Sequence, residues 1–274
     1  MVENPPTIGL LDSGVGAITI FQKIVEISPF YRQVMIFDNA GAPYGSRPKQ
    51  AVSQRIIDLA VSSHARLRFD ALVVACNTAS TISLAQLRQT LPIPIIGVVP
   101  AIKPATSQSR TGVIGLLATP STIAGSYTDE LIRSFGKGCR FEKLGSQRLV
   151  SIAEDKLRGI PPSNQILREI LAPLFKDPQM DTVVLGCTHF PFLLTELQRA
   201  APRKVRWVDS GKAVAKRVHQ IIEPLASHLI TPSHLVYLTK MTESISIWRQ
   251  RFAPLGVRCV GALDNNDTSS RLLD

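Results

Sequence analysis

Several features that mark common classes of protein are missing from this 274-residue sequence. The N-terminal stretch MVENPPTIGLLDSG lacks the basic region and the apolar region of a signal peptide. Apolar runs such as LPIPIIGVVPAI (91–102) are interrupted by prolines and are too short to span a bilayer. The sequence therefore predicts a cytoplasmic protein that needs no membrane.

Cysteine is scarce, and its spacing argues against metal and redox motifs. The four cysteines are Cys76, Cys139, Cys187 and Cys259. No CxxC pair and no Cys/His ligand spacing occurs, so neither a zinc site nor a thioredoxin-like motif is predicted. In a reducing compartment all four should be free thiols, and a free cysteine is usually a small buried apolar residue.

Acidic residues are outnumbered, with 21 Asp and Glu against 31 Lys and Arg and a net charge of +10. The basic residues are scattered, and no zinc-finger spacing or aromatic RNA-binding motif accompanies them. We interpret the charge as a basic surface that attracts anions nonspecifically. No nucleic-acid partner is expected to be required.

Cofactor motifs are also missing. The glycine-rich turn DSGVG (12–16) has Thr19 where a dinucleotide fingerprint needs its third glycine, and no GK[ST] of a P-loop follows. Its backbone N–H groups can hold a small anion such as a carboxylate. No lysine motif for a pyridoxal cofactor is evident, so we expect a protein that works without a cofactor.

What the sequence does contain is an alternation of continuous apolar runs with longer amphipathic ones. Strands are predicted at 7–12, 34–38, 71–76, 94–99, 112–118, 181–187 and 205–209, and helices at 17–28 and 50–67. Apolar runs without alternation, separated by helices, are typical of parallel strands buried on both faces. The predicted fold class is α/β with mainly parallel sheets.

Two landmarks recur at nearly the same separation. IGLLDSG begins at residue 8 and IGLLATP at residue 114, while LVVACNTAS and TVVLGCTHF place cysteines at 76 and 187. Such an echo predicts two similar α/β halves. It requires Cys76 and Cys187 to end equivalent strands, at the edge where open α/β sheets bind ligands.

The two cysteine motifs, CNTAS (76–80) and CTHFP (187–191), share one design of strand, cysteine and polar helix start. A helix N-terminus lowers the pKa of a thiol, and the thiolate is the reactive form. His189 can move a proton for Cys187, and Asp12 can do the same for Cys76. One Cys–His pair would suggest acyl transfer, whereas two matched thiols suggest an acid and a base on opposite faces of one carbon.

Further polar residues near these motifs can hold a polar substrate. Asn77, Thr78 and Thr188 offer donors and acceptors. In the loop NAGAPYGSRP (39–48), Tyr44 can donate a hydrogen bond and the Gly45 and Ser46 amides can bind a carboxylate, although an ordinary turn explains the loop equally well.

Six motifs occur along the sequence in this order, DSGVG, PYGSR, ACNTAS, ATPSTI, LGCTHFPFL and DSG (209–211). In these motifs and their order, the sequence resembles the glutamate racemases of the aspartate/glutamate racemase superfamily. The resemblance covers roughly residues 7–222. It implies a cofactor-independent enzyme that interconverts L- and D-glutamate and supplies D-glutamate for peptidoglycan. The alternatives are an aspartate or other amino-acid racemase, and a binding module that holds an amino acid without transforming it.

The resemblance also implies roles for particular residues. Cys76 and Cys187 match the two acid/base cysteines, Cys76 acting on D-glutamate and Cys187 on L-glutamate, and Asp12 and His189 match the residues that assist them. Substrate-binding pairs are matched by Asp12 and Ser13, Tyr44 and Gly45, Asn77 and Thr78, and Thr188 and His189. Glu154 matches a glutamate near the site, within a stretch that fits the family poorly.

This sequence departs from the family pattern around the predicted site. Ala17 stands where a second glycine is usual, and Asn39 and Gly41 replace a threonine and an arginine of the loop that contains Asp38. These changes leave every predicted reagent in place. They can alter affinity or subunit contacts.

The implied architecture has two pseudo-symmetric domains with glutamate between them. The first would comprise residues 1–99 plus 210–274, and the second residues 100–209. The segment after about residue 225 should add a helix and a strand to the first domain. The expected partners are glutamate and a second copy of the chain in a homodimer.

Overall fold

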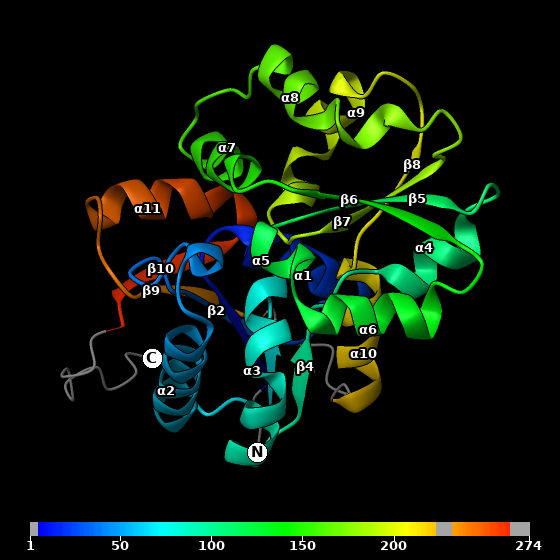
Figure 1. Ribbon diagram of the computed structural model, residues 1–274. Helices are drawn as coiled ribbons and strands as arrows, with labels where there is room; N and C mark the ends of the chain where they lie inside the picture. Colours follow the sequence, from blue (N-terminus) through cyan, green and yellow to red (C-terminus); the bar gives the residue numbers. More distant parts are fainter. Residues whose placement is uncertain (1–4, 223–231, 264–274) are drawn as a thin grey trace.

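The computed structural model describes residues 5–222 and 232–263, and it contains two β-sheets that are each covered by helices. In Figure 1 the second sheet lies above the first, and the helix α11 lies beside the level at which the two meet. Every strand pairing is parallel. The predicted class, α/β with parallel sheets in two similar halves, is confirmed.

The first sheet has the strand order β10-β9-β2-β1-β3-β4. Its strands are β1 (Thr7–Asp12), β2 (Arg32–Phe37), β3 (Ala71–Val74), β4 (Ile95–Gly97), β9 (His234–Leu238) and β10 (Val257–Ala262). The helices that belong to this half are α1 (Gly16–Ile27), α2 (Lys49–Leu67), α3 (Asn77–Thr90), α10 (Gly211–Ile221) and α11 (Ile245–Phe252), with the 3₁₀ turns η1 (Tyr44–Ser46) and η4 (Ala253–Leu255).

The second sheet has the order β6-β5-β7-β8. Its strands are β5 (Val113–Ala118), β6 (Arg140–Gly145), β7 (Thr182–Gly186) and β8 (Arg206–Val208). Around it lie α4 (Ile102–Gln108), α5 (Pro120–Ile123), α6 (Ser126–Phe135), α7 (Arg148–Leu157), α8 (Asn164–Leu171) and α9 (Leu194–Ala200), with η2 (Leu174–Lys176) and η3 (Phe190–Leu193).

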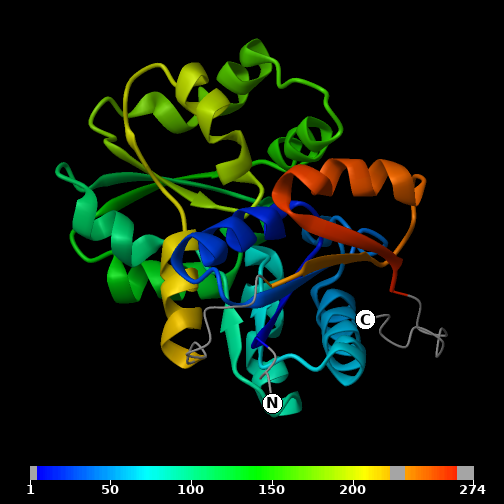
Figure 2. The same cartoon turned by 180° about the vertical axis from the view of Figure 1, so that it is seen from behind.

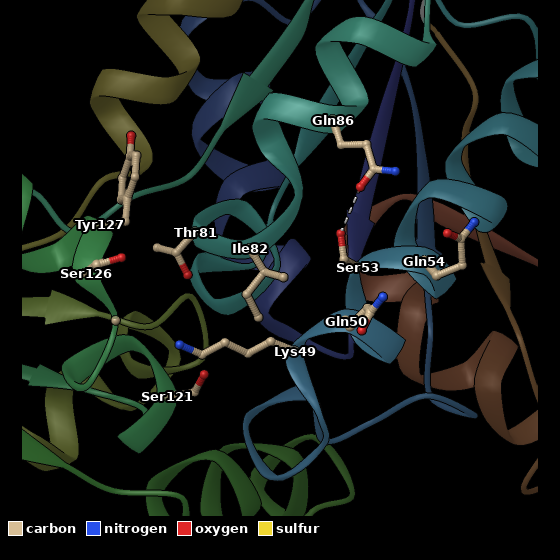
Figure 3. Close-up of a pocket in the computed structure, with 11 residues that line it drawn as sticks. Lys49, Gln50, Ser53, Gln54, Thr81, Ile82, Gln86, Ser121, Ser126 and Tyr127 are labelled. Carbon is tan, nitrogen blue, oxygen red and sulfur yellow. Dashed lines mark hydrogen bonds between the residues drawn. The ribbon is translucent and has the colours of Figure 1, made fainter.

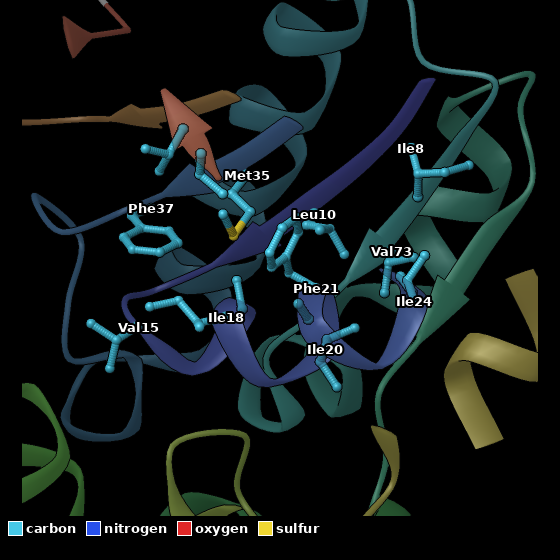
Figure 4. Packing of buried hydrophobic residues seen from close by; sticks show 14 of the residues in the cluster. Ile8, Leu10, Val15, Ile18, Ile20, Phe21, Ile24, Met35, Phe37 and Val73 are labelled. Atoms are coloured by element: carbon cyan, nitrogen blue, oxygen red, sulfur yellow. The ribbon is translucent and has the colours of Figure 1, made fainter. Parts of the chain in front are cut away.

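Successive side chains of each strand point to opposite faces of the first sheet, and helices cover both faces, so both are buried. Leu10 and Val73 pack on α1, α10 and α11, whereas Leu11 and Val74 pack on α2 and α3. Figure 4 shows the α1 side of this core, and Figure 2 shows the helices that cover it. Burying a large apolar side chain contributes about 1.5–3 kcal/mol, so these continuous apolar strands favour the interior of a sheet over its edge.

In the helix α2, apolar residues recur with the period of about 3.6 residues that is typical of an amphipathic α-helix. Its buried residues include Val52, Ile56 and Ala60, which recur every four positions and form one apolar stripe against the sheet. The helix ends at Arg68, whose backbone adopts the left-handed conformation with φ of 49°. Its opposite face is exposed and carries the charged side chains.

The two halves repeat one topology. Strands β2-β1-β3-β4 of the first sheet correspond in order to β6-β5-β7-β8 of the second. Cys76 follows β3 and Cys187 follows β7, so both cysteines end equivalent strands. The echo predicted from the sequence passes this test.

The expected domain limits at 99/100 and 209/210 stay a prediction, and residues 264–274 of the first domain lie outside the described residues. The two expected crossings do lie together. The Ser210 hydroxyl donates a hydrogen bond to the carbonyl oxygen of Val99. The two connecting segments are therefore tied to each other next to the contact between the halves.

The sequence interpretation missed two strands. The edge strand β6 is partly exposed along its length and carries Arg140, Glu142 and Lys143, so it has no continuous apolar run. The C-terminal segment provides β9, α11 and β10, which is one strand more than expected. In the described residues, no helix is long and apolar enough to cross a membrane.

Candidate active site

The residues expected at the site lie at the carboxyl ends of strands in both sheets. Asp12 is the last residue of β1, Cys76 lies between β3 and α3, and Cys187 follows β7 directly. All three are buried, with Cys76 7% and Cys187 6% exposed. This edge is where open parallel sheets bind small ligands.

Hydrogen bonds between the halves bring these two edges face to face. Thr188 Oγ1 donates to Asp12 Oδ2 at 3.0 Å, and Thr19 Oγ1 donates to the Thr188 carbonyl at 2.9 Å. On the other side, the hydroxyls of Thr78 and Thr119 lie 3.0 Å apart. The contacts are reciprocal, because the turn after β7 meets the end of β1 and the turn after β3 meets the end of β5.

A glycine permits the first of these contacts. A Cβ added to Gly16, the first residue of α1, would overlap Thr188 Oγ1 and lie 2.6 Å from Asp12 Oδ2. Real Cβ atoms essentially never approach another atom so closely. The glycine at the start of α1 therefore lets the two edges meet.

The second contact is a cluster of three buried threonines. Thr119 and Thr122, in the ATPSTI stretch, have hydroxyls 2.9 Å apart, and both lie within 3.4 Å of the Thr78 hydroxyl. Thr119 also caps α5 by accepting the Thr122 N–H. Sequence reasoning quoted this stretch but did not place Thr119 or Thr122 at the site.

Cys187 belongs to a chain of three side chains. Its Sγ lies 3.8 Å from His189 Nδ1, and His189 Nε2 lies 2.7 Å from Glu154 Oε1. Glu154, on α7, also accepts the backbone N–H of Val15 at 3.1 Å. The structure thus brings Glu154 to the site, as the resemblance implied, although the stretch around it fits the family pattern poorly.

The pKa values of His189 and Glu154 are shifted in opposite directions. Burial lowers the pKa of His189, but its contacts with Cys187 and Glu154 outweigh burial and raise the pKa well above its ordinary value. Burial raises the pKa of Glu154, yet the hydrogen bond and the charge of His189 bring the net value below its ordinary one. The pair is therefore an imidazolium and a carboxylate near neutral pH.

Cys76 has a different environment. Burial raises the pKa of its thiol and the charge of Asp12 raises it further, while hydrogen bonds from the Ala79 N–H and the Ser13 hydroxyl lower it. The Ala79 N–H at the start of the helix does lower this pKa, as predicted, but desolvation outweighs it and the net pKa of Cys76 is raised. Burial also raises the pKa of Asp12 to about 6.

Asn77 is a buried group that lacks a partner. Its side-chain amide nitrogen has no hydrogen-bond acceptor among the described residues. It borders a small cavity together with Cys187, Thr188 and Thr19. An unmet buried donor costs about 1–3 kcal/mol, and the carboxylate of a ligand can supply the missing acceptor.

The turn that begins with Tyr44 also lies between the halves. The Tyr44 hydroxyl donates to Asp38 Oδ2 at 2.7 Å, so it is engaged within the protein. At Gly45 an added Cβ would lie 3.2 Å from Gln147 Oε1 of the second half. Sequence reasoning placed Tyr44 and Gly45 here but named no role for Asp38.

A polar cavity of about 450 Å³ opens beside these residues, between α2, α3 and the segment that joins α5 to α6. In Figure 3 the Lys49 side chain extends toward Ser121, and Thr81 and Ile82 are among the other side chains that line the cavity. None of the expected catalytic or substrate-binding residues lines it. The candidate site is the buried contact itself.

No group of three or more His, Cys, Asp or Glu side chains in residues 5–222 and 232–263 is arranged to hold a metal ion. The four cysteines are free thiols. What the site presents is proton chemistry, with two thiols, a carboxyl group and an imidazolium–carboxylate pair.

The structure has two α/β halves with parallel sheets, and each half places a thiol at a strand end that faces the other half. These features define the class of protein. The family model for Asp/Glu/hydantoin racemases matches residues 8–218. The chain belongs to this family, and the resemblance seen in the sequence is confirmed.

Its relatives are named more specifically. A glutamate racemase of Pectobacterium carotovorum subsp. carotovorum is 43% identical over 250 residues, which cover 90% of this chain and 88% of the relative. One of Photorhabdus laumondii is 45% identical over 80% of this chain and 76% of the relative. The crystal structure of Escherichia coli glutamate racemase with L-glutamate and an activator, UDP-MurNAc-Ala, superposes with a TM-score of 0.87 at 37% identity, covering 94% of this chain and 98% of that one.

Proposed function

We propose that this protein interconverts L- and D-glutamate, with one cysteine removing the α-proton and the other returning a proton to the opposite face. The observation that carries the proposal is the pair of buried thiols at equivalent strand ends of two facing halves. Relatives named glutamate racemase support the choice of substrate.

In this scheme one proton leaves the substrate and one is returned to it, so the reaction needs no cofactor. A thiolate on one side takes the α-proton and becomes a thiol, and the thiol on the other side protonates the planar carbanion and becomes a thiolate. The two cysteines exchange protonation states while the substrate is inverted. Each needs a partner that resets its proton, which is general acid–base chemistry.

The surroundings support the assignment of Cys187 to L-glutamate and Cys76 to D-glutamate. Because the pKa of the Cys76 thiol is raised, it starts as a proton donor, as the reaction of L-glutamate requires. For D-glutamate it must first lose that proton, and Asp12, with a pKa of about 6, is an ionised base above that pH. His189, the imidazolium beside Cys187, instead holds a proton that it can give to Cys187.

The substrate is held by polar groups from both halves. Asn77 supplies its unmet amide donor, and Ser13, Thr78 and Thr188 supply hydroxyls at the strand ends. The backbone of the turn at Tyr44 and Gly45 is assigned to a carboxylate of glutamate. Because donors come from both halves, bound glutamate joins them.

Isotope exchange tests the reaction and the assignment together. In deuterated water, glutamate should lose optical activity and gain deuterium at the α-carbon, and aspartate should react far more slowly. Cys76→Ala and Cys187→Ala should each lose racemisation by at least about 10²-fold, the lower range for a missing acid or base. Cys76→Ala should still exchange L-glutamate with retention, and Cys187→Ala should still exchange D-glutamate.

Cys139→Ala is the matched control, since Cys139 precedes β6 and so lies at the amino end of that strand, whereas the site lies at carboxyl ends. Unchanged racemisation in either site variant would end the two-thiol assignment. Tight glutamate binding by the wild type without exchange would instead favour a binding module.

We further propose that the enzyme acts in the cytoplasm and supplies D-glutamate for peptidoglycan. Free thiols at both reacting positions fit a reducing compartment. The homodimer stays a prediction, which sedimentation of the 29.9 kDa chain can test.

A further inference from the structure

Asp38 is a fully buried carboxylate at the end of β2, and it receives an unusual number of donors. Arg55 donates from Nε at 2.6 Å and from Nη2 at 2.5 Å. The hydroxyls of Tyr44 and Thr239 each donate at 2.7 Å, and the Gly41 N–H donates at 3.2 Å. Both carboxylate oxygens are satisfied.

The arginine comes from outside the predicted site. Arg55 lies in the second turn of α2 and keeps 40% of its side chain exposed, while the carboxylate it binds is inaccessible. Its paired N–H donors match the two carboxylate oxygens, which is the strong bidentate geometry. A lysine has one point charge and cannot reproduce it.

Gly41 makes this approach possible. A Cβ at position 41 would overlap Asp38 Oδ2 and Arg55 Nε. A side chain at 41 and the guanidinium of Arg55 therefore compete for the same space. In this chain α2, and not the loop, supplies the cation for Asp38.

Tyr44 links this cluster to the reacting groups. It is 2% exposed and packs in the same apolar cluster as Cys76. Burial raises the pKa of Tyr44, and the charges of Asp38, Cys76 and Asp12 raise it further. The contacts thus run from Arg55 through Asp38 to Tyr44 and the Cys76 side of the site.

We propose that Arg55 is a positioning residue for the racemisation, acting through Asp38 to hold Tyr44 and the carboxylate-binding turn that Tyr44 begins. The inference rests on the proposed function. Arg55 does not touch the reacting thiols in this scheme. Its effect should therefore appear in substrate binding before it appears in turnover.

The test compares Arg55→Met with Arg55→Lys and with a control of the same chemistry, Arg199→Met. Arg199 is an exposed arginine on α9, in the second half. Arg55→Met should raise KM for both enantiomers by about tenfold or more, the equivalent of a lost charge-assisted hydrogen bond, with a smaller change in kcat. Arg199→Met should behave as the wild type.

The pH dependence distinguishes positioning from a general loss of structure. In the wild type, burial raises the pKa of Asp38, but the hydrogen bonds from Arg55, Thr239 and Tyr44 bring it below its ordinary value, so Asp38 stays ionised. Without Arg55, burial prevails and the pKa rises. Tyr44 then loses a charged acceptor at low pH and regains it at high pH.

The KM of Arg55→Met should therefore fall toward the wild-type value as the pH is raised from about 6 to about 9, a range in which wild-type Asp38 does not titrate. Arg55 and Tyr44 bond to Asp38, Arg47 donates to the Ala40 carbonyl of the same loop, and the charges of Cys76 and Asp12 act in turn on Tyr44. Arg55→Lys keeps the charge and should show a smaller KM defect that does not depend on pH. Asp38→Asn should show a defect without this pH dependence.

Each result decides the matter. If Arg55→Met matches Arg199→Met in KM at every pH, Arg55 has no positioning role. If its KM defect is independent of pH and follows a lowered melting temperature, the role is structural and the inference is overturned. If the wild type itself introduces no deuterium at the α-carbon of glutamate, the proposed function is wrong, and this inference, which rests on it, is wrong as well.

Discussion

Cys76 and Cys187 are nearly interchangeable in the sequence, but the structure surrounds them differently. Asp12 and Ser13 lie near Cys76, whereas His189 and Glu154 extend from Cys187. The motifs predicted both thiols, Asp12 and His189, because these lie within a few residues of a strand end. Glu154 was indicated only by the family resemblance and Arg55 not at all, since folding brings them to partners 35 and 17 positions away in the chain.

Glu154→Gln tests the imidazolium–carboxylate pair. A folded-state pKa that is raised, as for His189, contributes stability below the unfolded value, and this contribution is lost as the pH rises through the folded value. Loss of the carboxylate lowers the pKa of His189. Both the loss of stability and the alkaline decline of kcat that depends on His189 should therefore begin at lower pH.

The variant should also lose about tenfold in kcat/KM, and equally for both enantiomers, because the equilibrium constant of a racemisation is one. Glu169→Gln is the control, since Glu169 is exposed on α8 and its carboxylate accepts a hydrogen bond from Gln165 on the same helix. pH–rate profiles and unfolding by denaturant measure the effect. A profile that does not move would show that Glu154 does not hold the His189 charge.

At the scale of elements, strands with a continuous apolar run were predictable, and strands without one were not. β1, β5 and β7 are buried on both faces, so their residues carry a clear signal. The edge strand β6 owes its conformation to pairing with β5, which no local pattern in RFEKLG records. The turns after the strands were predictable as turns, but not the contacts they make across the halves.

Gly16→Ala should disrupt the meeting of these elements. The added methyl group would overlap Thr188 Oγ1 and lie 2.9 Å from His189 Nδ1. We expect a loss of about 1–3 kcal/mol in the free energy of unfolding, as for other overpacked sites, together with a marked loss of activity. Thermal unfolding and exchange assays measure both.

Gly125→Ala is a suitable control, because the nearest atoms to its added Cβ are carbonyl oxygens at 3.3 and 3.5 Å. It should keep nearly all activity. Wild-type behaviour of Gly16→Ala would mean that the contact between Thr188 and Asp12 is not required.

At the scale of the whole molecule, the site is closed. Both thiols are less than 8% exposed, so we expect the halves to part before glutamate enters. We expect such a motion to pivot at the connecting segments that the hydrogen bond between Ser210 and Val99 holds together. Substrate binding and closure are then one event.

Glutamate should therefore stabilise the fold as a whole. A ligand that binds only the folded state contributes about 2.7 kcal/mol at a concentration 100 times its Kd. We expect a rise in melting temperature with D- or L-glutamate, a smaller rise with aspartate, and a much smaller one with glutamate in Asn77→Ala. Melting temperatures that are the same with and without glutamate would contradict a site built from both halves.

The reciprocal contacts, β1 with the turn after β7 and β5 with the turn after β3, have a geometric consequence. They relate the halves by an approximate rotation, since a protein made of L-amino acids has no mirror plane. Consider an axis that lies in the plane of the carbanion. A rotation by half a turn about this axis moves a thiol from above the plane to the equivalent position below it. Duplicating one strand-and-thiol unit by rotation is therefore sufficient to treat two mirror-image substrates alike.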